Sequence, residues 1–116
     1  MFLGTVRNIS EVGKVREMTY EAYREMAEKE LLRIEKEMMR KWPLKKGRIV
    51  HRTGRLALKD ISVGIAVSSA HRADAFEACR YAIERIKRVA PIWKRERLST
   101  GKDIWVEGHR LERGKR

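Results

Sequence analysis

Both prolines of this 116-residue chain stand directly after an amphipathic repeat. Apolar residues recur at spacings of three and four from residue 23 to residue 42, just before Pro43, and again from Phe76 to Ala90, just before Pro91. Such spacing is typical of a helix with one buried face, and proline cannot continue a helix. The sequence therefore predicts one helix over residues 23–42 and a second that ends at residue 90.

The segments around these helices alternate apolar and polar residues, which is the pattern of β-strands. Expected strands cover residues 1–6, 15–20, 48–53, 61–69, 92–96 and 104–107, with residues 54–60 as a connection. The predicted order is ββαββαββ, in which strands come in pairs joined by short connections. This order favours an α+β fold, with two helices packed on a mainly antiparallel sheet, over a doubly wound parallel sheet.

Composition excludes several classes of protein. No apolar run approaches the ~20 residues that a bilayer-spanning helix needs, and the first residues lack the pattern of a signal peptide. The single cysteine, Cys79, cannot form an internal disulfide, and neither it nor the three histidines have metal-ligand spacing. We therefore expect a cytoplasmic protein that uses no metal and no bound cofactor.

The net charge of +12 is concentrated in two segments. Residues 40–59 hold eight basic and no acidic residues, and residues 87–116 hold ten basic and four acidic residues. A surface of this kind attracts an anion, which can be nucleic acid, phosphate or an acidic protein face. The alternative is a densely charged surface typical of heat-adapted proteins.

Two sets of residues are candidates for chemistry. His71 and Arg72 open the second helix, where free backbone N–H groups and the helix dipole favour an anion such as phosphate. Lys87 lies about 20° around that helix from Phe76, at the expected edge of the apolar stripe, and Lys94 follows on a predicted strand. Two ammonium groups that approach each other would lower the pKa of at least one, which could then act as a base or nucleophile. The alternative for both sets is an ordinary surface side chain.

Several blocks of residues, taken in order, resemble the large, catalytic subunit of molybdopterin synthase. The resemblance covers essentially the whole chain up to residue 108, and blocks in the right order are more specific than any one of them. The blocks are residues 2–8 (FLGTVRN), 20–23 (YEAY), 49–54 (IVHRTG), 69–72 (SAHR), 91–96 (PIWKRE) and 105–107 (WVE).

The resemblance implies an α/β hammerhead-like fold and a sulfurtransferase of molybdenum-cofactor biosynthesis. In that family the large subunit forms a homodimer, and each copy binds a small ubiquitin-like sulfur carrier, which gives a heterotetramer. The C-terminal Gly-Gly thiocarboxylate of the carrier enters the pocket of the large subunit. The substrate is cyclic pyranopterin monophosphate, and two added sulfurs make the dithiolene of molybdopterin.

The functional residues of the family can be carried onto this chain by position. Its catalytic lysines fall on Lys87 and Lys94. In relatives, an arginine shortly after the block that matches residues 105–107 often contributes to the pocket of the neighbouring subunit. In this chain we expect His109 or Arg110 to take that place. The implied substrate-binding residues are Arg7, His71 and Arg72, with either His109 or Arg110.

The resemblance also has two limits. The family ordinarily has a further strand and helix before the block that begins here at residue 2, so we expect a chain that lacks these N-terminal elements. Residues 1–108 are expected to form a single domain and residues 109–116 a basic, flexible tail.

The alternative functions are a non-enzymatic module that binds nucleic acid and an inactive scaffold that binds the carrier. The resemblance assigns no role to the +8 charge of residues 40–59.

Overall fold

The structure, a computed structural model, describes residues 1–7, 9–10 and 13–107. The expected tail, with His109 and Arg110, lies outside the described residues. In the described part of the chain, neither helix is long and apolar enough to cross a membrane. The elements are strands β1 (Phe2–Thr5), β2 (Ile9–Ser10), β3 (Gly13–Ala22), β4 (Leu44–His51), β5 (Gly54–Ala57), β6 (Ile61–Ser69), β7 (Ile92–Leu98) and β8 (Asp103–Glu107), and helices α1 (Arg24–Lys41) and α2 (Arg72–Val89).

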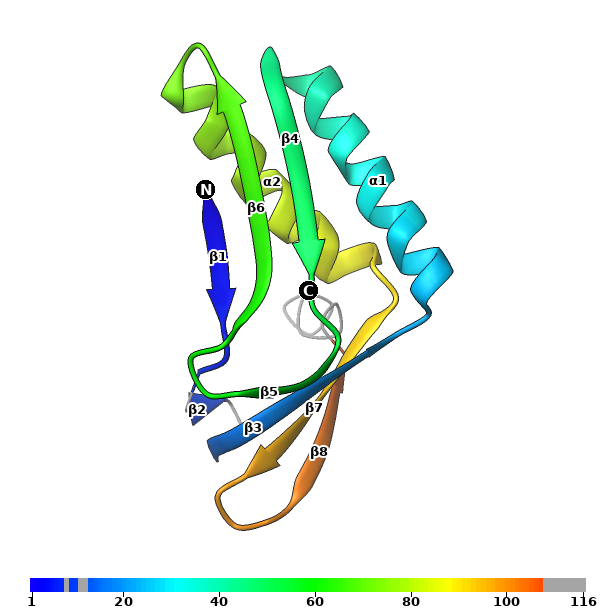
Figure 1. Ribbon diagram of the computed structural model, residues 1–116, viewed down its shortest axis with the longest axis vertical. Helices are drawn as coiled ribbons and strands as arrows, with labels where there is room; N and C mark the ends of the chain where they lie inside the picture. The colour runs from blue at the N-terminus through cyan, green and yellow to red at the C-terminus, as the bar shows by residue number, and fades with distance from the viewer. Residues whose placement is uncertain (8, 11–12, 108–116) are drawn as a thin grey trace, which may run out of the picture.

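Three strands form the first sheet, in the order β1-β6-β4. Both pairings are antiparallel, and Ile65 in the central strand lies opposite Phe2 on one side and Ile49 on the other. Figure 1 shows α2 crossing behind β6 and β4, with α1 beside β4. The predicted fold class, two helices on antiparallel sheet, is confirmed. The helices and this sheet enclose the helix-side core, whose fully buried members include Ile34, Met38, Ile65, Ala78 and Ala82.

Small side chains make the buried face of α2. Ala78, Cys79, Ala82 and Ile86 are buried, and the alanines allow the helix to lie close to its neighbours. Phe76 lies about 120° around the helix from Ala82 at 100° per residue, and it is 71% exposed. The expected stripe is therefore wrong at Phe76, whereas its members Cys79, Ile86 and Ala90 are buried as predicted. Lys87 shares the side of Phe76, so it is an exposed residue rather than one at the edge of the buried face.

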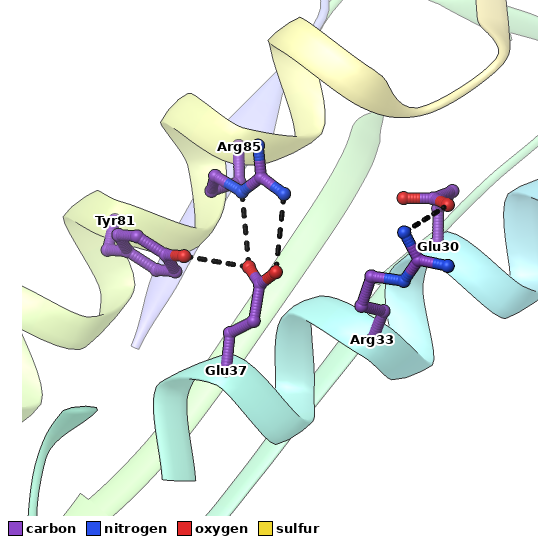
Figure 2. A network of polar contacts seen from close by, with 5 residues as sticks. All are labelled: Glu30, Arg33, Glu37, Tyr81 and Arg85. Atoms are coloured by element: carbon purple, nitrogen blue, oxygen red, sulfur yellow. Dashed lines mark hydrogen bonds and ion pairs between the residues drawn. The ribbon is translucent and has the colours of Figure 1, made fainter. Parts of the chain in front are cut away.

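A carboxylate network joins the two helices, as Figure 2 shows. Tyr81 Oη donates to Glu37 Oε1 at 2.7 Å, and Arg85 donates to the same oxygen through Nε at 3.1 Å and to Oε2 through Nη2 at 3.3 Å. The Arg85 hydrogen bond is the main cause that lowers the pKa of Glu37. A fork of this kind fixes the relative position of the helices.

The second sheet has the order β2-β3-β7-β8, with β5 paired to β3. Its strands cross below the first sheet in Figure 1. Strand β5 was expected to be a connection, and it pairs with β3 from Glu17↔Ala57 to Tyr20↔Gly54. This sheet encloses the strand-side core, which consists of Val6, Val15, Met18, Leu56 and Leu98.

The basic segment at residues 40–59 includes an edge strand of the first sheet. Lys45, Lys46 and Arg48 are exposed on β4, and the Ile49 N–H donates to a carboxylate oxygen of Glu35 on α1 at 2.8 Å. Charged side chains on an edge strand, and a helix beside it, discourage pairing with another chain. Part of the +8 charge is therefore explained by protection of this edge.

Candidate active site

Lys94 lies in the middle of β7, on the face of the second sheet that covers the strand-side core. Its side chain is 21% exposed, and Nζ lies 3.7 Å from Oε2 of Glu96, two residues along the same strand. Residues i and i+2 of a strand share a face, so the pairing follows from the strand itself. The chain therefore holds a largely buried ammonium group that is paired with a carboxylate.

Two other cations act on this ammonium group. Burial is the main cause that lowers the pKa of Lys94; the charges of Arg7 and Lys87 lower it further, while Glu96 raises it. Lys87 belongs to the last turn of α2, and Arg7 follows β1 in the chain. The charge of Lys87 acts on Lys94 as expected, but burial, rather than the second lysine, is the largest influence on the pKa of Lys94.

The position of Arg7 is determined by the residue before it. The Val6 N–H donates to the Asp60 carbonyl oxygen at 2.9 Å, and the Val6 carbonyl accepts from the Lys59 N–H at 2.9 Å. Val6 is itself buried in the strand-side core. Both backbone polar groups of Val6 are therefore held directly before Arg7, whose side chain is exposed.

Glu96 is a site residue that sequence reasoning missed. It is 2% exposed, and its Oε1 has no hydrogen-bond partner within the described part of the chain. Glu96 stands in one of the blocks that carry the family resemblance, but no role was assigned to it. The Lys94-x-Glu96 spacing on a strand was the available signal, because it places both side chains on one face.

Tyr20 and His51 adjoin the lysine. Tyr20 lies directly opposite Lys94 across β3 and β7, and its ring contacts the ring of His51 edge to face at 4.9 Å between centroids. The Nδ1–H of His51 donates to the Arg52 carbonyl oxygen at 2.8 Å. Burial lowers the pKa of His51, which favours the neutral imidazole at neutral pH. Neither residue was predicted as part of the site.

His71 and Arg72 lie at the other end of α2. His71 takes the N-cap position without a capping hydrogen bond from its side chain, and both residues are exposed. Lys87 is fifteen residues beyond Arg72 on the same helix, a distance of about 22 Å at 1.5 Å per residue. One copy of the chain therefore does not bring His71 and Arg72 to the lysine cluster. His109 and Arg110 are outside the described residues.

The opposite face of β7 carries a separate pocket. Trp93, next to Lys94 in sequence, points away from it and lines a pocket of about 290 Å³ with Glu21, Ala22 and Tyr23. Across residues 1–7, 9–10 and 13–107, no group of three His, Cys, Asp or Glu side chains is placed to hold a metal ion. The lysine cluster, in which Arg7 and Lys87 act on Lys94, has a charge suited to an anionic substrate.

Comparison with known proteins identifies the family of the chain. A model of the MoaE protein family matches residues 1–89. The chain belongs to the MoaE family. It is 50% identical over 111 residues to the molybdopterin synthase catalytic subunit of Halalkalibacterium halodurans, covering 96% of this chain and 70% of that protein. It is 47% identical to the catalytic subunit of Thermoplasma volcanium, covering 90% of this chain and 76% of the relative.

Solved structures of MoaE relatives share the fold. The molybdopterin synthase of Staphylococcus aureus superposes with a TM-score of 0.84 at 48% identity, covering 90% of this chain and 76% of that one. The complex of subunits 1 and 2 of the molybdopterin-converting factor of Helicobacter pylori, at 20% identity, shares the fold with a TM-score of 0.73, covering 91% of this chain and 68% of that one. The resemblance to the catalytic subunit of molybdopterin synthase is confirmed, with an enzymatic role in molybdopterin biosynthesis, and a nucleic-acid-binding module is not favoured.

Proposed function

We propose that this MoaE protein transfers sulfur from the C-terminal thiocarboxylate of a small carrier protein to cyclic pyranopterin monophosphate, forming the dithiolene of molybdopterin. The observation that carries the proposal is the half-buried ammonium of Lys94, with Arg7 and Lys87 as its cationic neighbours. Both substrates bring negative charge, a thiocarboxylate and a phosphate, to a site of matching sign. We expect this reaction to take place in the cytoplasm.

Lys94 is proposed to carry protons in this reaction. For each sulfur, a carbon–sulfur bond forms on the pterin side chain, an oxygen leaves it, and water finally releases the carrier as a carboxylate. Lys94 donates a proton to the leaving oxygen as a general acid, and a lowered pKa brings its two protonation states closer to balance near neutral pH. Lys87 assists the attack of the thiocarboxylate and stabilises the negative charge that develops on the intermediate.

Anion binding is divided between two places on the chain. Arg7 is exposed beside Lys94, where a guanidinium fork suits a carboxylate or phosphate. His71 and Arg72 are proposed to serve the lysine cluster of a second copy, because the length of α2 separates them from Lys87 of their own chain. Two apolar side chains of the first sheet are exposed, Leu3 at 49% and Val50 at 60%. This exposed apolar surface supports the proposal of a homodimer.

The carrier completes the proposed assembly. The Helicobacter pylori relative was solved as a complex of subunits 1 and 2, which supports a small subunit as the partner of this chain. Two copies of the chain with two carriers give a heterotetramer. Residues 1–108 are proposed as the catalytic domain and 109–116 as a basic tail, with His109 or Arg110 contributing to the neighbouring pocket.

Reconstitution tests the proposal. The protein is mixed with carrier that ends in a thiocarboxylate and with cyclic pyranopterin monophosphate, and dithiolene product is measured. Carrier with an ordinary carboxylate terminus is the matched control. We expect product only with the thiocarboxylate form. Binding of the carrier without any product would contradict sulfur transfer and leave a scaffold.

A further inference from the structure

A second pocket lies where the two helices join the second sheet. Strand β3 leads into α1 through Tyr23, and α2 leads into β7 through Pro91; Figure 1 shows these connections at the right of the molecule. The Tyr23 N–H donates to the Pro91 carbonyl oxygen at 3.2 Å and ties the connections together. The adjoining pocket of about 290 Å³ is lined by Glu21, Ala22, Tyr23 and Trp93. Its walls are therefore the adjacent ends of two paired strands.

Two aromatic rings form part of this pocket. Tyr23 and Trp93 contact edge to face, with 5.2 Å between ring centroids and 87° between ring planes. Tyr23 is 65% exposed, so a ligand can reach its ring. Between the helices, Lys41 Nζ lies 5.3 Å from the ring centroid of Tyr81. Within the described part of the chain, no lysine or arginine lies over either ring of the pocket in this way, so their negative faces are free to receive a cation.

A carboxylate completes the pocket. Glu21 lies directly opposite Trp93 in the pairing of β3 with β7, so both side chains are on the face of the sheet that lies away from Lys94. Glu21 is exposed, and among the residues that the structure describes it has no hydrogen bond or ion pair. Arg95, two residues along the same face of β7, is engaged in an interaction of its own. In a chain of net charge +12, Glu21 thus gives the pocket a charge opposite to that of the whole protein.

The size of the pocket and the chemistry of its walls restrict the ligand. About 290 Å³ is at the lower end of the range for pockets that bury a whole small molecule, roughly 300 to 1,000 Å³. One long side chain fits such a space. Arginine suits these walls, because its planar group can stack on a ring while its N–H groups pair with a carboxylate. Tryptophan and tyrosine are also enriched among the central contacts of protein interfaces, so these features favour a partner protein over a free metabolite.

We propose that the pocket of Glu21, Tyr23 and Trp93 binds an arginine side chain presented by a partner protein. The guanidinium group stacks on an aromatic ring, and its N–H groups donate to the Glu21 carboxylate. The pocket lies on the face of β7 away from Lys94. It is therefore a separate site, which does not depend on the sulfur transfer proposed above.

A peptide with a single arginine, acetyl-Gly-Arg-Gly-amide, is the probe. The indole N–H signal of Trp93 is followed by 1H–15N NMR on the full chain, and Trp93→Phe assigns it. We expect the signal to shift and saturate with a Kd in the millimolar range, while the signal of Trp42, which contacts Tyr81, stays in place. A Trp93 signal that does not move with up to about 50 mM peptide would overturn the site.

A peptide with citrulline in place of arginine tests the charge, because it keeps the shape of the side chain and removes the cation. It should bind at least about fivefold more weakly than the arginine peptide. Equal binding of the two peptides would reduce the pocket to an apolar contact and contradict the proposal.

Two variants test the walls of the pocket. Glu21→Gln should weaken the arginine peptide about threefold to fivefold, and Tyr23→Leu, which removes the ring, about threefold or more. Glu28→Gln is the matched control, because Glu28 is an exposed glutamate of α1 that does not line the pocket. Melting temperatures check that each variant is folded. Equal weakening by Glu21→Gln and Glu28→Gln would show a general attraction of charge and no specific site.

Methylguanidinium separates a protein side chain from a free cation. It carries the charged group alone, without the methylenes that would pack in the pocket or the peptide that would lie along its rim. We expect it to bind at least about fivefold more weakly than the arginine peptide. Equal affinity would show that the pocket takes any small guanidinium ion and would overturn the assignment to a partner protein.

Discussion

Two glutamates, a partly buried one and a buried one, each have a basic partner and mark a structural and a chemical region of the molecule. Glu37 between the helices receives three hydrogen bonds, from Tyr81 and from two nitrogens of Arg85. Glu96 on β7 is even less exposed, yet it has one ion pair, with Lys94 at 3.7 Å, and an oxygen without a partner in the described part of the chain.

The difference shows what each region is built to do. A fully paired carboxylate holds its partners rigidly and favours a single arrangement. Glu96 leaves Lys94 less tightly held, with two other cations nearby and a lowered pKa. Such a lysine is able to exchange a proton with a substrate, whereas the Arg85 guanidinium does not give up its proton.

The largest effect should follow removal of the ammonium group by Lys94→Gln. Sulfur transfer should fall roughly a thousandfold, because proton donation to the leaving oxygen is lost. The fold should lose roughly 3 kcal/mol, because Glu96 becomes a buried charge without a partner. Dithiolene formation and denaturant unfolding measure the two losses.

The double variant Lys94→Gln with Glu96→Gln tests the cause of each loss. Removing both charges should restore most of the stability and none of the activity. Restored activity would show that Lys94 matters only as the counterion of Glu96.

A smaller effect is expected at Lys87, which is exposed. Lys87→Ala should slow sulfur transfer roughly a hundredfold and change stability by less than about 0.5 kcal/mol. Arg88→Ala removes the same charge from the next residue of α2 and is the matched control. Equal losses of activity in the two variants would indicate a general effect of charge.

A change in the carboxylate network between the helices should lower stability and leave activity unchanged. Glu37→Gln is expected to lower the free energy of unfolding by about 1 to 2 kcal/mol, because the charge-assisted hydrogen bonds to Arg85 weaken. The kcat of the folded protein should stay unchanged. A loss of kcat at full folding would mean that the two regions are coupled.

The smallest effect is a pH dependence of stability. The pKa of Glu37 is lowered from its ordinary value of 4.5, mainly by the hydrogen bond from Arg85. As pH falls, the unfolded chain takes up this proton first, so the stabilisation is complete above that value and is lost below it. Unfolding curves from about pH 6 to about pH 3 should show the difference between the unmodified protein and Glu37→Gln shrinking with acid. A constant difference would contradict the assignment.

Local patterns predicted most of the fold. The helices end next to Pro43 and Pro91, and β6 covers the predicted residues 61–69. Strand β5 was missed, because four residues with one buried side chain carry little periodicity and their pairing with β3 is non-local. The predicted stripe was wrong at Phe76 alone, because Ala78 and Ala82 face the core in place of this large apolar residue.

The site was predictable in part. The resemblance named Arg7, Lys87 and Lys94, and the charges of the first two lower the pKa of the third, while their roles stay predictions. Glu96 could have been found from its strand spacing. Tyr20 and His51 could not, because these residues are distant in sequence and their rings meet only in the folded chain.

Titration of Lys94 tests the central claim most directly. The 13Cε signal of this residue, followed against pH by NMR, reports the pKa of the ammonium group itself. The account predicts that Lys94 titrates clearly below the exposed lysines, whose ordinary value is 10.5, and moves toward them when Arg7 or Lys87 is replaced by a neutral residue. A Lys94 that titrates together with the exposed lysines would contradict the claim that burial and neighbouring cations prepare it for proton transfer.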